Sequence, residues 1–64
     1  MRKDVKELVD QAVDQGWRAE ERKSGRILLF SPDGHTIVTL HGTPSDRNWR
    51  KAAVRELKKG GFVD

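Results

Sequence analysis

Two short connections near the middle of the chain constrain its fold more than any other feature. Lys23-Ser24-Gly25 and Pro32-Asp33-Gly34 are typical of turns, and each joins two segments of extended, partly apolar character. In the second turn, Pro fixes φ, Asp bonds back to the backbone and Gly adopts a positive φ. Parallel strands need a crossover of about a dozen residues or more, so these connections permit only antiparallel neighbours. Residues 17–22, 26–31 and 36–41 are therefore predicted to form a three-stranded antiparallel meander.

Helical periodicity flanks these strands on both sides. Before them, apolar residues recur at the spacing of one helical face up to Gly16, where a left-handed C-terminal cap would end the helix near Gln15. After them, Thr43 is predicted to cap a second helix, with Pro44 in its first helical position and its end near Lys59.

The expected architecture is one small α+β domain that occupies residues 1–64. Its order is α-β-β-β-α, with both helices on one face of the sheet. At 64 residues, the chain can bury only about 60% of its unfolded surface. It has no Cys, which excludes disulfides and thiolate metal sites, so packing or self-association must supply the stability. We therefore expect a homodimer.

No apolar run in the sequence is long enough to span a membrane, and the N-terminus lacks the apolar core of a signal peptide. We expect a cytoplasmic protein with no membrane partner.

Cations gather toward the end of the chain, whose net charge is +3. In the predicted second helix, four cations follow one another at helical spacing with Arg50 beside them: Arg47, Lys51, Arg55 and Lys58. Such a stripe can lie along phosphates, or it can be a solvated face whose last cations complement the helix dipole. Lys23 begins the first turn and Arg26 follows it. We predict that these seven cations contact nucleic acid.

Two histidines, His35 and His41, are the candidates for proton transfer. Imidazoles can also bind metals, but the chain offers no third His, no Cys and no paired-carboxylate motif nearby, so neither a metal nor a cofactor is predicted. A general acid or base role for either histidine competes with the simpler interpretation that both lie on the surface.

The predicted sheet has too many apolar residues for one covered face. If Leu28 and Phe30 point to the helices, Ile27 and Leu29 point away, and Ile37 joins them. An apolar second face is usually buried against something. Ile27, Leu29 and Ile37 are therefore predicted to form a protein interface, in a dimer or with a partner protein, unless the small domain tolerates a partly solvated face.

Several short segments, in this order and spacing, resemble HicA-type toxins, a family of small mRNA-cleaving proteins with a fold like the double-stranded-RNA-binding domain. The resemblance covers most of the chain and is carried by these segments: Glu7-Leu8, Gln15-Gly16-Trp17, Arg22-Lys23-Ser24-Gly25, Ser31-Pro32-Asp33-Gly34, His41-Gly42 and Leu57-Lys58-Lys59-Gly60-Gly61-Phe62. It implies the α-β-β-β-α fold, an RNA target and a place in a toxin–antitoxin system with an antitoxin partner.

The family's catalytic residue is a His in a Gly-Ser-His motif that opens the second strand, where it serves as acid and base while a ribose 2′-hydroxyl attacks the adjacent phosphate. This chain has Ser24-Gly25-Arg26 at the corresponding positions. Arg stabilises negative charge but does not shuttle protons near neutral pH. We therefore expect a degenerate relative, of the kind encoded by bacteriophages, that binds RNA or another nucleic acid without cleaving it.

Two alternative functions stay open. The chain could be a protein-interaction module that acts through its apolar sheet face as a dimer or as an inhibitor of a host protein. It could also be a weak ribonuclease that uses His35 or His41.

Overall fold

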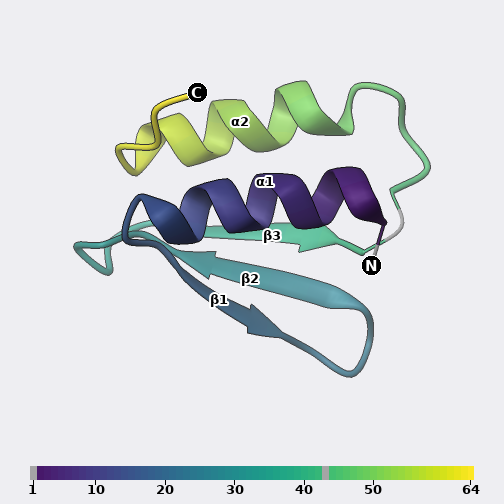
Figure 1. Cartoon of the computed structure of the whole chain (residues 1–64), viewed down its shortest axis with the longest axis horizontal. Coiled ribbons are helices and arrows are strands. Elements are labelled where there is room, and N and C mark those ends of the chain that lie inside the picture. The colour runs from purple at the N-terminus through teal and green to yellow at the C-terminus, as the bar shows by residue number, and fades with distance from the viewer. Residues whose placement is uncertain (1, 43) are drawn as a thin grey trace.

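The computed structural model describes residues 2–42 and 44–64 and has the predicted fold class (Figure 1). Helix α1 (Lys3–Asp14) is followed by strands β1 (Arg18–Glu21), β2 (Arg26–Phe30) and β3 (Ile37–His41), and then by helix α2 (Trp49–Lys59). The strands form an antiparallel sheet in the order β1-β2-β3, which confirms the α-β-β-β-α meander. Both helices pack on one face of the sheet and share a single core with it.

Helix α1 ends as its sequence predicts. Gly16 has a φ of 95°, and its N–H donates to the Val13 carbonyl at 3.0 Å. The next N–H, that of Trp17, reaches back to the Ala12 carbonyl at 3.0 Å. These two bonds satisfy carbonyls at the helix end, and the left-handed conformation that they need favours glycine. The chain leaves this cap directly into β1.

Helix α2 begins later than predicted. Thr43 lies outside the described residues, and Pro44 precedes the helix by several residues instead of opening it. The Asp46 carboxylate accepts the Asn48 N–H at 2.9 Å, and the Asp46 carbonyl accepts the Trp49 N–H at 3.3 Å. An Asp side chain that bonds two residues ahead offers the backbone a turn in place of a helix. The first helical turn is therefore delayed to Trp49.

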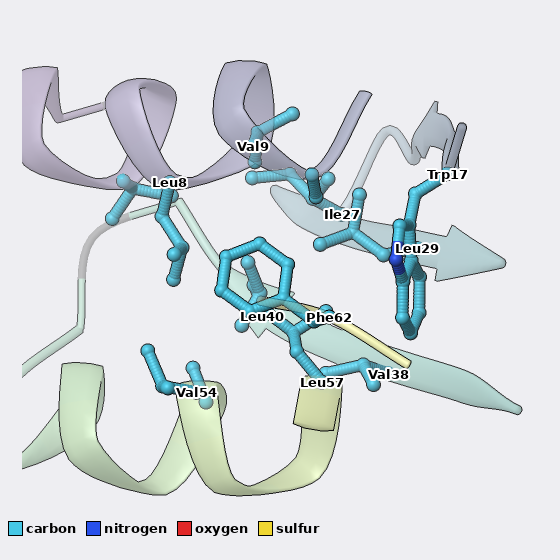
Figure 2. Packing of buried hydrophobic residues seen from close by; sticks show 13 residues of the cluster. Leu8, Val9, Trp17, Ile27, Leu29, Val38, Leu40, Val54, Leu57 and Phe62 are labelled. Atoms are coloured by element: carbon cyan, nitrogen blue, oxygen red, sulfur yellow. The ribbon is translucent and has the colours of Figure 1, made fainter. Parts of the chain in front are cut away.

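The core lies between the helices and one face of the sheet (Figure 2). It consists of these buried hydrophobic residues: Val5, Leu8, Val9, Ala12, Trp17, Ile27, Leu29, Val38, Leu40, Ala53, Val54, Leu57 and Phe62. Apart from Trp17 and Phe62, which follow α1 and α2, these residues form one stripe along each helix and occupy alternate positions in β2 and β3.

The prediction that Ile27 and Leu29 face away from the helices is wrong. Ile27 is 2% exposed and Leu29 is fully buried in the core. The register pairs Ile27 with Leu40 and Leu29 with Val38, so these side chains all point toward the helices. Leu28 and Phe30 therefore occupy the outer face, where both are half-buried. Of the predicted interface residues, only Ile37 lies on that face, with 58% of its surface exposed.

Candidate nucleic-acid interface

Four of the predicted cations lie together along one flank of α2. Arg50, Lys51, Arg55 and Lys58 line a shallow groove whose wall also includes Val54, Lys59 and Asp64. The arrangement follows from helix geometry, because Ala53, Val54 and Leu57 turn toward the core and leave the charged positions at the solvent side. We call these four cations, Arg50, Lys51, Arg55 and Lys58, the cationic flank.

Acidic side chains offset little of this charge. The Asp64 carboxylate lies 3.6 Å from the Arg50 guanidinium, and both side chains are about half exposed. Exposed pairs of this kind contribute only about 0–1 kcal/mol, so a phosphate can replace the carboxylate. Within residues 2–42 and 44–64, no salt bridge involves Lys51, Arg55 or Lys58. The cationic flank is thus available to an anion.

A second group of basic side chains lies on the outer face of the sheet. Arg26 is directly opposite His41 in the β2–β3 pair. On its other side, the Arg22 N–H donates to the Arg26 carbonyl at 2.7 Å, so Arg22 continues the same row beyond the end of β1. Residues opposite one another in antiparallel strands share a face. The three side chains Arg22, Arg26 and His41 therefore form one row, which we call the basic row.

Apolar side chains adjoin the basic row on the outer face. Leu28 is flanked by Glu20 and Thr39, and Phe30 is flanked by Arg18 and Ile37. The Arg22 guanidinium lies 3.3 Å from the Glu20 carboxylate, a contact between two exposed side chains. The outer face thus combines an apolar strip, Leu28, Phe30 and Ile37, with cations at both of its ends.

The structure does not unite all the predicted site residues. Lys23 lies in the β1–β2 turn beside the basic row, whereas the cationic flank belongs to the helix layer on the other face of the sheet. Arg47 lies in the turn before α2, outside the helix on which it was predicted. His41 ends β3 next to Arg26, but His35 belongs to the β2–β3 connection. That connection and the β1–β2 turn lie at opposite ends of the sheet (Figure 1).

Arg22 was missed as a site residue by the sequence reasoning. The signal that could have found it is the two-residue period of Arg18, Glu20 and Arg22, which places these side chains on one face of the sheet. Which face this is becomes clear only once the β1–β2 register is known.

His35 belongs to a turn whose polar groups already have partners. The Ser31 hydroxyl donates to the Asp33 carboxylate, which also accepts the His35 N–H at 3.0 Å. The Thr36 N–H donates to the Ser31 hydroxyl at 3.0 Å. Two hydrogen bonds hold the pKa of Asp33 below its ordinary value of 3.8. The bond from the Ser31 hydroxyl has the larger effect, and the bond from the His35 N–H has the smaller one. Asp33 is therefore an ionised turn residue.

The part of the chain that the structure describes offers neither a cluster of metal-binding side chains nor a membrane-spanning helix. No group of three His, Cys, Asp or Glu residues there is arranged to hold a metal ion. None of the described helices is both long enough and apolar enough to cross a membrane.

Comparison with protein families, with curated proteins and with solved structures finds no match to this chain. The resemblance to HicA-type toxins therefore stays a prediction, supported by the short segments described above.

Proposed function

We propose that this protein is a small HicA-toxin-like domain that binds RNA through the cationic flank of α2 and does not cleave it. The observation that carries the proposal is the clustering of Arg50, Lys51, Arg55 and Lys58 along one groove that contains a single acid, Asp64. Arg26, which opens β2 where the resemblance places a catalytic His, supports binding without cleavage.

The cationic flank suits a duplex backbone. From Lys51 to Lys58 the helix rises about 10 Å at 1.5 Å per residue, which is enough to follow more than one phosphate. Arg side chains bind phosphates with two parallel hydrogen bonds, and Lys side chains act as point charges. A-form RNA presents its backbone and 2′-hydroxyls across a wide, shallow minor groove, so recognition by shape requires no base contacts.

Salt dependence is the first test of this proposal. Fluorescence anisotropy with a labelled RNA duplex should show a log–log slope of roughly −3 to −4 against salt if four cations neutralise phosphates, at about −0.9 per contact as in duplex DNA. In the double variant R55A/K58A, the slope should be shallower by roughly 2, because two phosphate contacts are lost. An affinity that does not change with salt concentration would refute the proposal.

A matched control separates local contact from net charge. Lys3 and Lys6 are exposed cations on α1 that do not line the groove of the cationic flank, and K3A/K6A removes the same charge as R55A/K58A. We expect K3A/K6A to bind nearly as wild type does. Equal losses in both double variants would show that binding follows net charge alone, contrary to the proposal.

The basic row favours a second candidate function, that of a weak ribonuclease. His41 could take the proton of a ribose 2′-hydroxyl as its oxygen bonds to phosphorus, and then return that proton to the 5′-oxygen as the phosphorus–oxygen bond breaks. Arg26, directly opposite, could stabilise the charge on phosphorus. Cleavage of labelled RNA that disappears in H41A but persists in H35A would support this function, and equal behaviour of wild type and both variants would exclude it.

The apolar strip of the outer face favours a third candidate, a protein-interaction module that binds an antitoxin or host protein. Its residues are Leu28, Phe30 and Ile37, in place of the set predicted from the sequence. Mixed apolar and charged faces of this kind are typical of interfaces. A partner identified by co-purification should lose affinity for I37D and keep it for R55A/K58A; the reverse pattern would exclude this face.

A further inference from the structure

The free edge of β3 has backbone groups that point away from the sheet. Hydrogen bonds at the two ends of the β2–β3 hairpin, from the Gly42 N–H to the Gly25 carbonyl and from the Ser31 N–H to the Thr36 carbonyl, are both 2.9 Å long. Bonded and non-bonded pairs alternate along an antiparallel ladder. Alternate residues of β3 therefore bond to β2, and the N–H and carbonyl groups of the others point to the open side: Ile37, Thr39 and His41.

The two edges of the sheet differ in how they are protected. β1 carries charges at Arg18, Glu20 and Glu21, three of its four residues. Charged side chains on an edge strand discourage pairing with another chain. β3 has the sequence Ile-Val-Thr-Leu-His, with neither an acid nor a Lys, Arg or Pro. Of the two edge strands, only β1 therefore has charged side chains that discourage pairing with another chain.

Space for another strand lies directly beside β3. A groove of about 500 Å³ runs along the whole strand, and its opposite wall is formed by residues 44–46 and by one flank of α2. That flank presents Trp49, Ala52 and Glu56, whereas the cations of α2 line the groove on its other side. An approaching strand would thus meet small, aromatic or acidic side chains and no cation of the cationic flank.

We propose that the occupant of this edge is a second copy of the chain, whose β3 pairs antiparallel with the first about a two-fold axis through Thr39. In this register, Thr39 faces Thr39 of the second copy, and Ile37 faces His41. Each of these pairs exchanges two N–H···O=C bonds, because the same residues point their backbone groups outward in both copies. No like charges oppose one another, and the two sheets become continuous.

Two observations favour a second copy over an unrelated strand. The edge is complementary to itself in both backbone groups and side chains, as a two-fold contact requires. The chain is also small and without Cys, so added burial at an interface supplies stability that its thin core lacks. This dimer does not depend on the proposed RNA binding, because it leaves the cationic flank uncovered.

Charge substitutions at Thr39 test the axis directly, by sedimentation velocity of the full chain from micromolar to millimolar concentration. T39K and T39E each place like charges opposite one another, and each should weaken self-association by roughly tenfold or more. An equimolar mixture of the two should associate again, because opposite charges then meet on the axis. T39V should self-associate as tightly as wild type does. S24K adds the same positive charge as T39K but in the exposed β1–β2 turn, so it should also associate as wild type does.

Hydrogen exchange on the wild-type protein gives an independent readout that no folding defect can obscure. The amides of Ile37, Thr39 and His41 should gain protection as concentration rises, whereas those of Val38 and Leu40 should be protected at every concentration. A wild-type protein that stays monomeric, T39K that associates as tightly as wild type, or a mixture no stronger than its components would each overturn the proposal.

Discussion

The helix cap at Gly60 permits a quantitative test of the packing. Gly60 has φ −97° and ψ 9°, a backbone conformation that alanine also adopts. A Cβ at this position would nevertheless lie 2.5 Å from Cη2 and 2.9 Å from Cζ2 of Trp17. Carbon atoms in contact are normally about 3.5–4.0 Å apart. Because Trp17 is only 3% exposed, its ring has no solvent to move into.

The cost of G60A follows from this overlap. Overpacking a well-filled core typically costs about 1–3 kcal/mol, and an overlap of about 1 Å at the ring belongs at the upper end. Replacing Gly by Ala also raises the free energy of unfolding by roughly 0.4–1 kcal/mol, because it reduces the conformational entropy of the unfolded chain. We expect a net loss of about 2 kcal/mol, which for a domain of this size lowers Tm by roughly 8–16 °C.

A double-mutant cycle with W17F separates ring overlap from other effects. Phe lacks the outer ring of Trp, so in the W17F background G60A should be neutral or should stabilise the protein by up to about 1 kcal/mol, giving a coupling free energy of about 2–3 kcal/mol. Gly61 is the matched control: it has a φ of 97° and open space around a Cβ, so G61A should lose about 1–2 kcal/mol through backbone strain alone, equally in both backgrounds. Urea unfolding followed by far-ultraviolet circular dichroism measures all variants. The reasoning is refuted if G60A costs as much in the W17F background as it does in the wild-type protein.

Two further predictions address the sheet and the turn. L29N places an amide in the core and should cost about 3–5 kcal/mol, whereas L28N on the outer face should cost about 1 kcal/mol; similar losses in urea unfolding would contradict the assignment of the two faces. The pKa of Asp33 is lowered by the Ser31 hydroxyl and the His35 N–H, so its carboxylate stabilises the fold at pH values above 3.8 and loses this effect as the pH falls through its folded pKa. D33N should therefore be less stable than wild type at neutral pH, with a difference that shrinks below about pH 4; a pH-independent difference would show that the ionised form is unimportant.

Local signals account for the parts of the fold that could be predicted from the sequence. Gly16, Gly25 and Gly34 all have positive φ, as helix-cap and turn positions favour, and the connections are too short for anything but an antiparallel meander. The start of α2 was misjudged for a reason that is also local. Pro44 and Asp46 fit a first helical turn as well as they fit a preceding turn, and the hydrogen bonds of Asp46 decide between them.

The face of β2 was not decided by its own residues. Ile27, Leu28, Leu29 and Phe30 are all apolar, so a period of two is satisfied by either assignment. Pairing with β3 resolves it, because Val38 and Leu40 are the apolar alternate positions of that strand, and their partners Leu29 and Ile27 must share their face. The predicted interface failed at these two residues because register is a non-local property.

The candidate sites also differ in whether local sequence or tertiary structure brings their residues together. The sequence alone determined the cationic flank, since residues on one helix meet through a spacing that any α-helix imposes. Only the tertiary structure could bring Arg22, Arg26 and His41 into one row, separate His35 from them, and leave the β3 edge open beside α2. Each of these depends on which strands pair and in which register, and that choice is made by burial of the whole core rather than by any single segment.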